Sequence, residues 1–164
     1  MFKNFLCALF LLTAAQLPAL EVGRDGESFE KDGITWHNVK YIDKGHNLHA
    51  ALPGNPTFTA SSTGNLISSE CEGAKYEVQV YTMGVPNTPA ALIAYAQLTP
   101  GTKAWEVRKP KNSKCSFMIG YERKEKGKKI AAGQVFVTKS GAYNFLVVGD
   151  LTHLAEVIKS VKIK

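Results

Sequence analysis

Cysteine and histidine are scarce in this chain, and its residues form no recognised catalytic motif. The 164 residues contain three cysteines and four histidines. The sequence has no Gly-x-Ser-x-Gly nucleophile elbow, no Gly-rich phosphate loop followed by lysine, no His-Glu-x-x-His and no Cys-x-x-Cys. Catalytic groups can still meet in a fold without a local motif. The sequence alone therefore gives no positive reason to expect an enzyme.

Two cysteines, Cys71 and Cys115, lie outside the apolar N-terminal run. In an oxidising compartment an even number predicts one disulfide, which would close a loop of about 45 residues and stabilise the fold by roughly 4 kcal/mol. The alternatives are two separately buried thiols, or a catalytic thiol at Cys115, where Lys114 supplies positive charge. Both cysteines alternate with apolar residues of predicted strands, which favours a structural role.

The pair His46 and His49 is the only hint of a metal site. On a helix this spacing would place both side chains on one face, but the surrounding pattern indicates a loop entering a strand, where odd spacing sends them to opposite faces. His37 lies nearby in sequence, and Glu70 or Glu72 could add an oxygen ligand. A catalytic zinc site needs three protein ligands. Because the third cannot be placed, we expect exposed polar residues at a sheet edge, and neither a metal nor another cofactor.

The strongest surface feature is the basic segment from Lys103 to Lys139. It contains eleven Lys or Arg against three Asp or Glu, a net charge of +8, in a chain whose formal net charge is +6. Two predicted loops hold most of this charge, and they could lie on one side if the strands that they flank are neighbours. Their basic residues form the candidate binding surface: Arg108, Lys109, Lys111, Lys114, Arg123, Lys124, Lys126, Lys128 and Lys129.

A basic surface of this kind predicts an anionic partner. Each cation near an anionic membrane contributes about 1 kcal/mol, so peripheral contact with a membrane is one expectation. Another envelope component, such as a polysaccharide, or an acidic protein fits the same charge. Nucleic acid is the usual partner of basic patches, but the predicted export of the chain argues against it. The alternative is that these lysines bind no partner and only keep two exposed turns well solvated.

Export is predicted from the N-terminus. Lys3 precedes a continuous apolar run at residues 5–12, and small residues follow it. This order is typical of a cleavable signal peptide, here residues 1–19, with cleavage after Ala15 or Ala19. The run is shorter than the roughly 20 apolar residues of a membrane span. We therefore expect a periplasmic or secreted protein, and an uncleaved anchor is the alternative.

The rest of the chain predicts a flexible polar leader at 20–34 and a single globular domain at 35–164. Alternating apolar patterns bounded by Gly, Pro and Asn predict strands at 35–43, 47–52, 57–62, 66–72, 75–82, 104–109, 113–124, 128–138 and 142–149. The last of these is apolar on both faces, which predicts a central strand.

Two helices complete the predicted domain. Thr88 as N-cap and Pro89 at the first position predict a helix through residue 98. Asp150 is the predicted cap of a second helix, whose apolar stripe is Leu151, Leu154, Ala155 and Ile158. The fold class is therefore α+β, an antiparallel sheet of about six to eight strands packed with two helices. A barrel with peripheral helices is the alternative.

The layout resembles that of PsbP-like domains, named after an extrinsic subunit of photosystem II and including many exported bacterial proteins of uncharacterised function. The resemblance covers roughly residues 35–164 and rests on the turn Leu52-Pro53-Gly54-Asn55-Pro56, the strand at 75–82, a mid-chain helix, a late hairpin and the ending Ser160-Val161-Lys162-Ile163. It implies an α/β/α sandwich with an accessory or binding role. It carries over no site residue and no photosynthetic partner.

Three functions follow from these observations. The first is an exported, non-enzymatic accessory or binding protein whose basic loops meet an anionic partner. The second is a small-ligand carrier with a pocket between sheet and helix, where Trp36, Trp105 or Tyr95 would line the wall. The third is a small hydrolase that uses the Cys115 thiol or a metal held by His46 and His49.

Overall fold

The computed structural model describes residues 20–43, 45–61, 64–82, 84–111 and 113–164. The predicted signal peptide lies outside these ranges. No helix within them is long and apolar enough to cross a membrane.

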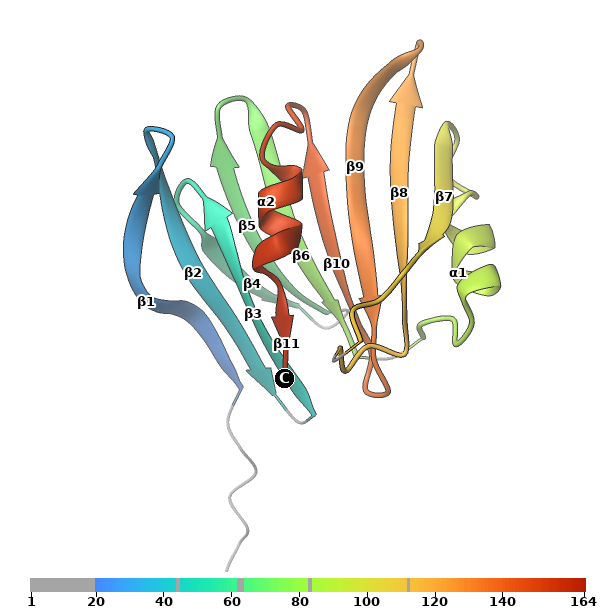
Figure 1. The fold of residues 1–164 in the computed structure, drawn as a ribbon, viewed down its shortest axis with the longest axis horizontal. Coiled ribbons are helices and arrows are strands. Elements are labelled where there is room, and N and C mark those ends of the chain that lie inside the picture. Colours follow the sequence, from blue (N-terminus) through green and yellow to red (C-terminus); the bar gives the residue numbers. More distant parts are fainter. Residues whose placement is uncertain (1–19, 44, 62–63, 83, 112) are drawn as a thin grey trace, which may run out of the picture.

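Two antiparallel sheets and two helices make up the described chain (Figure 1). The smaller sheet has the order β1-β2-β3-β11, and the larger has the order β4-β5-β6-β10-β9-β8-β7. The strands of the smaller sheet are β1 (Glu21–Lys31), β2 (Ile34–Asp43), β3 (His46–Pro53) and β11 (Lys162–Ile163). Those of the larger sheet are β4 (Thr57–Ser61), β5 (Gly64–Cys71), β6 (Ala74–Tyr81), β7 (Thr102–Val107), β8 (Phe117–Glu125), β9 (Lys128–Val137) and β10 (Ala142–Val148).

Strand β10 is the middle strand of the larger sheet, which confirms its prediction as a central strand. Tyr143, Phe145 and Val147 point to one face, where they are at most 1% exposed. The alternate residues Ala142, Asn144 and Leu146 point to the opposite face. The two faces have different coverings, and this difference creates the candidate site.

The first face carries the main core. Smaller-sheet residues such as Trp36, Tyr41 and Leu52 pack against Tyr76 and Val78 of the larger sheet. Helix α2 (Leu154–Ser160) lies in the same layer as the smaller sheet and contacts β3 and β9 (Figure 1).

The second face is covered only in part. Helix α1 (Pro89–Ala96) packs on β7 and β8, where Leu92 joins a second core cluster with Phe117 and Ile119. The Thr88 hydroxyl accepts a hydrogen bond from the Ala91 N–H at 3.3 Å, and Pro89 begins the helix, as the sequence predicts. Because α1 has only eight residues, it leaves much of this face open.

Residues 21–31 differ from the expected flexible leader, since they form strand β1 paired with β2. The pairing uses backbone hydrogen bonds, so the polar composition of β1 does not prevent it. Phe29 of β1 stacks on Trp36 of β2, with the ring centroids 6.3 Å apart. An edge strand whose side chains mostly face solvent lacks the alternation by which strands are recognised in a sequence.

The second helix is shorter than predicted, but Leu151, Leu154 and Ile158 of the predicted stripe pack against the main core. Asp150 does not cap it, because its carboxylate accepts hydrogen bonds from the Thr152 N–H and hydroxyl, and the helix begins at Leu154. Val157 is the buried residue of α2, while Ala155 is exposed. The Asp-x-Thr turn competes with the helix for the same backbone.

Candidate functional site

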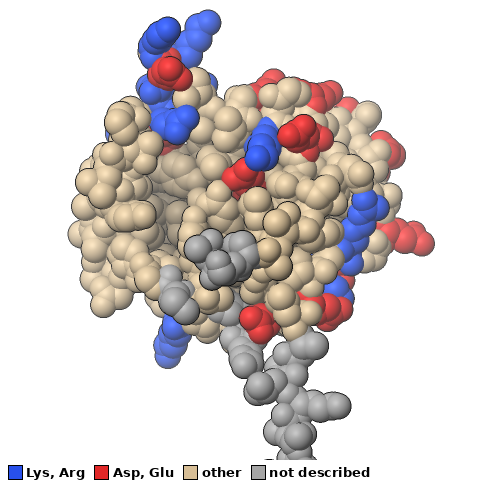
Figure 2. Space-filling model, turned by 180° about the vertical axis from the view of Figure 1, so that it is seen from behind, with Lys and Arg blue, Asp and Glu red and all other residues tan. Residues whose placement is uncertain are grey.

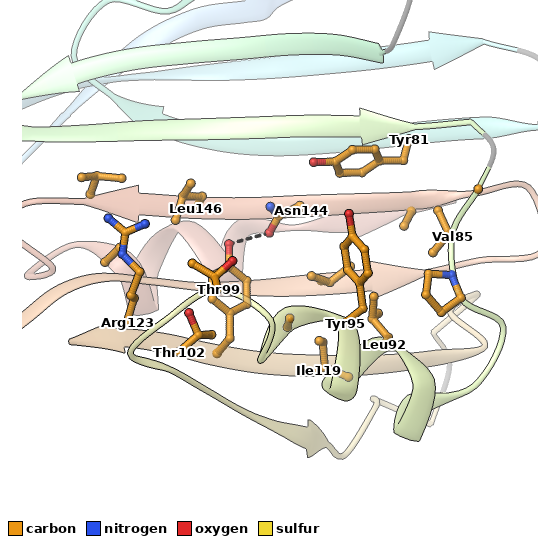
Figure 3. Close-up of a pocket in the computed structure, with 18 residues that line it drawn as sticks. Tyr81, Val85, Leu92, Tyr95, Thr99, Thr102, Ile119, Arg123, Asn144 and Leu146 are labelled. Atoms are coloured by element: carbon orange, nitrogen blue, oxygen red, sulfur yellow. Dashed lines mark hydrogen bonds between the residues drawn. The ribbon is translucent and has the colours of Figure 1, made fainter. Parts of the chain in front are cut away.

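A pocket of about 320 Å³ lies between α1 and the open face of the larger sheet. Its walls are mostly apolar and include Val85, Leu92, Ile119, Val135, Leu146 and Val148. Figure 3 shows it as a trough that follows the strands, with Val85 at one end and Arg123 at the other. Pockets of about 300–1,000 Å³ with mostly apolar walls and a few polar groups are typical of small-ligand sites.

A row of hydrogen bonds crosses three strands on this face of the sheet, and two of its members, Tyr121 and Asn144, line the floor of the trough. The Tyr121 hydroxyl donates to Asn144 Oδ1 at 2.7 Å, and Asn144 Nδ2 donates to Gln79 Oε1 at 3.0 Å. Gln79 Nε2 in turn donates to Glu77 Oε2 at 2.8 Å. Burial raises the pKa of the Tyr121 hydroxyl above its usual range, so this group stays protonated as a donor. The row fixes the orientation of both amides and makes the floor rigid.

Gly133 of β9 makes this row possible. Tyr121 of β8 lies opposite Gly133, and Gly133 lies opposite Leu146 of β10. A Cβ atom on Gly133 would stand 2.5 Å from the Tyr121 hydroxyl oxygen. Without a side chain there, the tyrosine crosses β9 and reaches Asn144.

The rim of the trough exposes large apolar side chains. Tyr81 is 39% exposed, Tyr95 66% and Val148 38%, and Leu98, which follows α1, is 76% exposed. Figure 2 views this side of the molecule and shows a hollow bordered mostly by uncharged residues, with Lys and Arg side chains above it. Exposed apolar surface grouped around a hollow is typical of a binding site.

Arg123 is the one charged residue among the described residues that line the trough. It is exposed, and within the described chain its guanidinium has no ion pair or side-chain hydrogen bond. Thr102 lies opposite it on β7, and Thr99 lies close by (Figure 3). An unpaired guanidinium at the end of an apolar trough can receive a carboxylate or phosphate through two parallel hydrogen bonds.

The structure separates the two basic loops. One connects β7 to β8 and holds Arg108, Lys109, Lys111 and Lys114, whereas the other is the β8–β9 turn. They lie at opposite ends of the nine-residue strand β8, which is about 27 Å long. A single patch on one side is therefore not formed. Lys109 has a structural contact, since its Nζ donates to the Cys115 carbonyl at 2.9 Å.

The expected Cys71–Cys115 disulfide is not present in the structure, where both thiols are free. Cys71 lies opposite Ala74 at one end of the larger sheet. Cys115 precedes Phe117, which lies opposite Val137 at the other end. The seven-residue span between these ends is roughly 20 Å, whereas a disulfide needs Cα atoms within about 7 Å.

Neither cysteine has the setting of a nucleophile. Burial raises the pKa of the Cys115 thiol, and this effect outweighs the Ser113 hydrogen bond and the Lys109 charge. Burial and the Glu72 carboxylate raise the pKa of Cys71. We expect intact-mass analysis to give the same mass with and without reductant. Alkylation near neutral pH should be slow at Cys71 and should reach Cys115 only after unfolding, because little thiolate forms there. Rapid native labelling of Cys115 would contradict this assignment.

The histidine pair does not gather ligands. His49 Nδ1 lies 2.7 Å from Asp25 Oδ2, and its Nε2 lies 3.0 Å from Asn47 Oδ1. His46 is the first residue of β3, and its side chain lies outside what the structure describes. Among the described residues, no group of three His, Cys, Asp or Glu could hold a metal ion.

Of the three aromatic residues expected to line a pocket, only Tyr95 does so. Trp36 is 2% exposed in the main core. Trp105 packs over Gly120 on the face of the sheet that lies opposite the trough. Its neighbour Ala104 pairs with Tyr121, which lines the trough, and adjacent residues of a strand point to opposite faces. Tyr121, Asn144 and Gln79 alternate with core residues along their strands, so neither their types nor their spacing indicates a site in the sequence.

Compared with known proteins, the chain matches no family model, no curated protein and no solved structure.

Proposed function

We propose that this protein is a non-enzymatic binding protein for a small amphiphile, a molecule with an apolar body and one anionic group. The apolar body lies in the trough between α1 and the larger sheet, and the anionic group pairs with Arg123. The protein makes and breaks no bond in this function. It holds the ligand and shields its apolar part from water.

The observation that carries this proposal is the single unpaired cation at one end of an otherwise uncharged trough. Apolar walls such as Leu92, Ile119 and Leu146 gain free energy by covering a hydrocarbon, at about 25 cal/mol per Å² buried. Arg123 then selects for a negative group and fixes the direction in which the ligand lies. The rim residues Tyr81 and Tyr95 are exposed, and a ligand in the trough would cover part of their apolar surface.

Isothermal titration with dodecanoate and with dodecyltrimethylammonium tests this function, since the two probes share a chain and differ in charge. We expect dodecanoate to bind the wild-type protein and the cation to bind far more weakly. Arg123→Gln should weaken dodecanoate binding by about 10- to 100-fold, because a hydrogen-bonded charge contributes about 1.5–3 kcal/mol.

Two further variants control this experiment. Lys128→Gln removes the same charge from β9 outside the trough and should leave dodecanoate affinity within about twofold, since exposed charges are largely screened by solvent. Leu146→Trp fills the trough and should abolish binding of both probes. If neither probe binds the wild-type protein, or if Arg123→Gln binds dodecanoate as wild type does, this function is wrong.

The resemblance to PsbP-like domains and the export of the chain remain proposals beside this function. Helices on opposite faces of the larger sheet support the resemblance, whereas the four-stranded second sheet was not part of the expected layout. A binding role outside the cytoplasm agrees with both. N-terminal sequencing of the protein recovered from its native cells tests the export.

A further inference from the structure

We infer that the tip of the β8–β9 hairpin, residues 123–129, docks the protein on an anionic lipid membrane, from which the trough takes its ligand at the Arg123 end. The choice of a lipid surface rests on the proposed function, because an anionic amphiphile is found in such a membrane. The docking itself rests on separate observations of shape and charge at the tip.

The tip projects beyond the rest of the larger sheet. Strand β10 last pairs with β9 at Val148 and Ala131, and β7 first pairs with β8 at Thr102 and Arg123. Just beyond these positions the Lys124 N–H donates to the Gly101 carbonyl and the Gly149 N–H donates to the Ile130 carbonyl. Within the described chain, residues 125–129 pair only between β8 and β9. Figure 1 shows this hairpin extending past its neighbours. A projecting two-stranded ribbon can reach a flat surface without obstruction by the domain.

The charge of the tip is strongly positive. It contains Arg123, Lys124, Lys126, Lys128 and Lys129, all exposed, against the single acid Glu125. Lys124 and Lys129 both pair with Glu122, at 3.5 Å and 2.5 Å. Lys126 and Lys128 have no ion pair within the described chain, so they are free to meet an anionic surface.

The turn holds these lysines at the outermost point of the hairpin. Lys126 has φ +48° and Gly127 has φ +79°, the two positive values of a type I′ turn. Asn or Asp is the usual residue before Gly in such a turn, because a lysine is disfavoured at positive φ. Lys126 therefore occupies a strained backbone position for which Asn or Asp is better suited. What lysine adds at this position is a positive charge.

A membrane fits this tip better than an acidic protein does. Apart from Arg123, which also lines the trough, the described tip residues are exposed charged residues and Gly127, and they offer no large apolar side chain that would anchor a folded partner. Arg123 belongs both to the tip and to the trough. A ligand leaving a bilayer beside the tip would therefore meet the Arg123 end first, with its anionic group already near the guanidinium.

Sedimentation with vesicles tests the docking. The full chain without its first 19 residues is mixed at low salt with vesicles of phosphatidylcholine alone or with 30% phosphatidylglycerol, roughly the anionic content that gives a strong surface potential. We expect binding only to the anionic vesicles. The variant Lys126→Glu/Lys128→Glu should bind them at least tenfold more weakly. The matched control Arg108→Glu/Lys111→Glu reverses the same amount of charge at the other end of β8 and should keep most of the binding.

Several results would overturn the inference. They are no wild-type binding to anionic vesicles, equal loss of binding in both double variants, or tip-dependent binding to poly-glutamate without binding to vesicles, which would make the partner an acidic protein. Titration of free dodecanoate separates this inference from the proposed function. If the tip variant still binds dodecanoate but wild type ignores vesicles, only the docking fails. If vesicles bind but dodecanoate does not, the proposed function fails.

Discussion

Gly133→Ala is expected to lower the free energy of unfolding by about 3 kcal/mol, the upper part of the range for an overpacked interior. The new Cβ would overlap the Phe145 carbonyl oxygen and would stand 2.5 Å from the Tyr121 hydroxyl oxygen. Tyr121 must then leave β9, and its hydrogen bond to Asn144 is lost. Because the displaced ring has only the trough to enter, dodecanoate binding should fall together with stability. Urea denaturation and isothermal titration measure the two effects.

Two variants separate the steric effect from other consequences. Gly23→Ala places the same methyl group in strand β1, where nothing lies within 4 Å of the new atom, and it should cause no loss of stability. Tyr121→Phe keeps the ring and removes the hydroxyl, and it should cost about 1 kcal/mol, the usual value of one hydrogen bond. If the Gly133→Ala and Gly23→Ala variants have the same free energy of unfolding, then Tyr121 does not pack closely over Gly133 of β9.

The strands that carry a clear alternation were predictable. The sequence around Tyr76, Val78 and Val80 has period two, and β6 buries these three side chains. The apolar pattern of residues 142–149 likewise predicts a central strand, and β10 is the middle strand of the larger sheet, although its second face is only partly covered. In both cases burial of one set of side chains leaves a pattern in the chain itself.

Elements held by their backbone were not predictable in this way. Strand β1 pairs along β2 with few buried side chains, so its polar sequence indicated a leader. The division into two sheets also depends on which strands pair, and short strands such as β4 and β11 carry too few residues to show their partners. Pairing is decided by the whole chain, whereas periodicity is a local property.

The candidate site was the least predictable part. Residues Gln79, Tyr121 and Asn144 are distant in sequence and meet only because β6, β8, β9 and β10 are neighbours in register. Arg123 looked like one of nine similar basic residues, and its position facing the trough is what distinguishes it. The other side chains that line the trough are uncharged, but the residues next to Arg123 in the sequence are mostly lysines. The sequence around Arg123 therefore does not indicate its uncharged surroundings.

The second large expected effect on stability is at Gly54, where the turn after β3 meets β5 and joins the two sheets. Gly54 follows strand β3, and its N–H donates to the Thr35 carbonyl at 2.9 Å. Its φ is +79°, and a Cβ there would overlap the Glu70 carbonyl oxygen of β5 and stand 3.0 Å from Ser69 Oγ. Ser69 in turn donates to the Pro53 carbonyl at 2.5 Å. Gly54→Ala should therefore lower the free energy of unfolding by about 3 kcal/mol or more, since the strain of positive φ adds to the overlap.

Gly127→Ala provides the control for this variant, because Gly127 has the same φ of +79° but nothing lies within 4 Å of its added Cβ. It should cost only the conformational strain, about 1 kcal/mol. The difference between the two variants in urea denaturation then measures how closely β5 approaches the turn after β3. Equal losses would mean that this approach does not exist, and that the two sheets meet elsewhere. A larger loss for Gly54→Ala with dodecanoate affinity unchanged would place the joint and the trough on independent parts of the fold, as their positions on opposite faces of the larger sheet require.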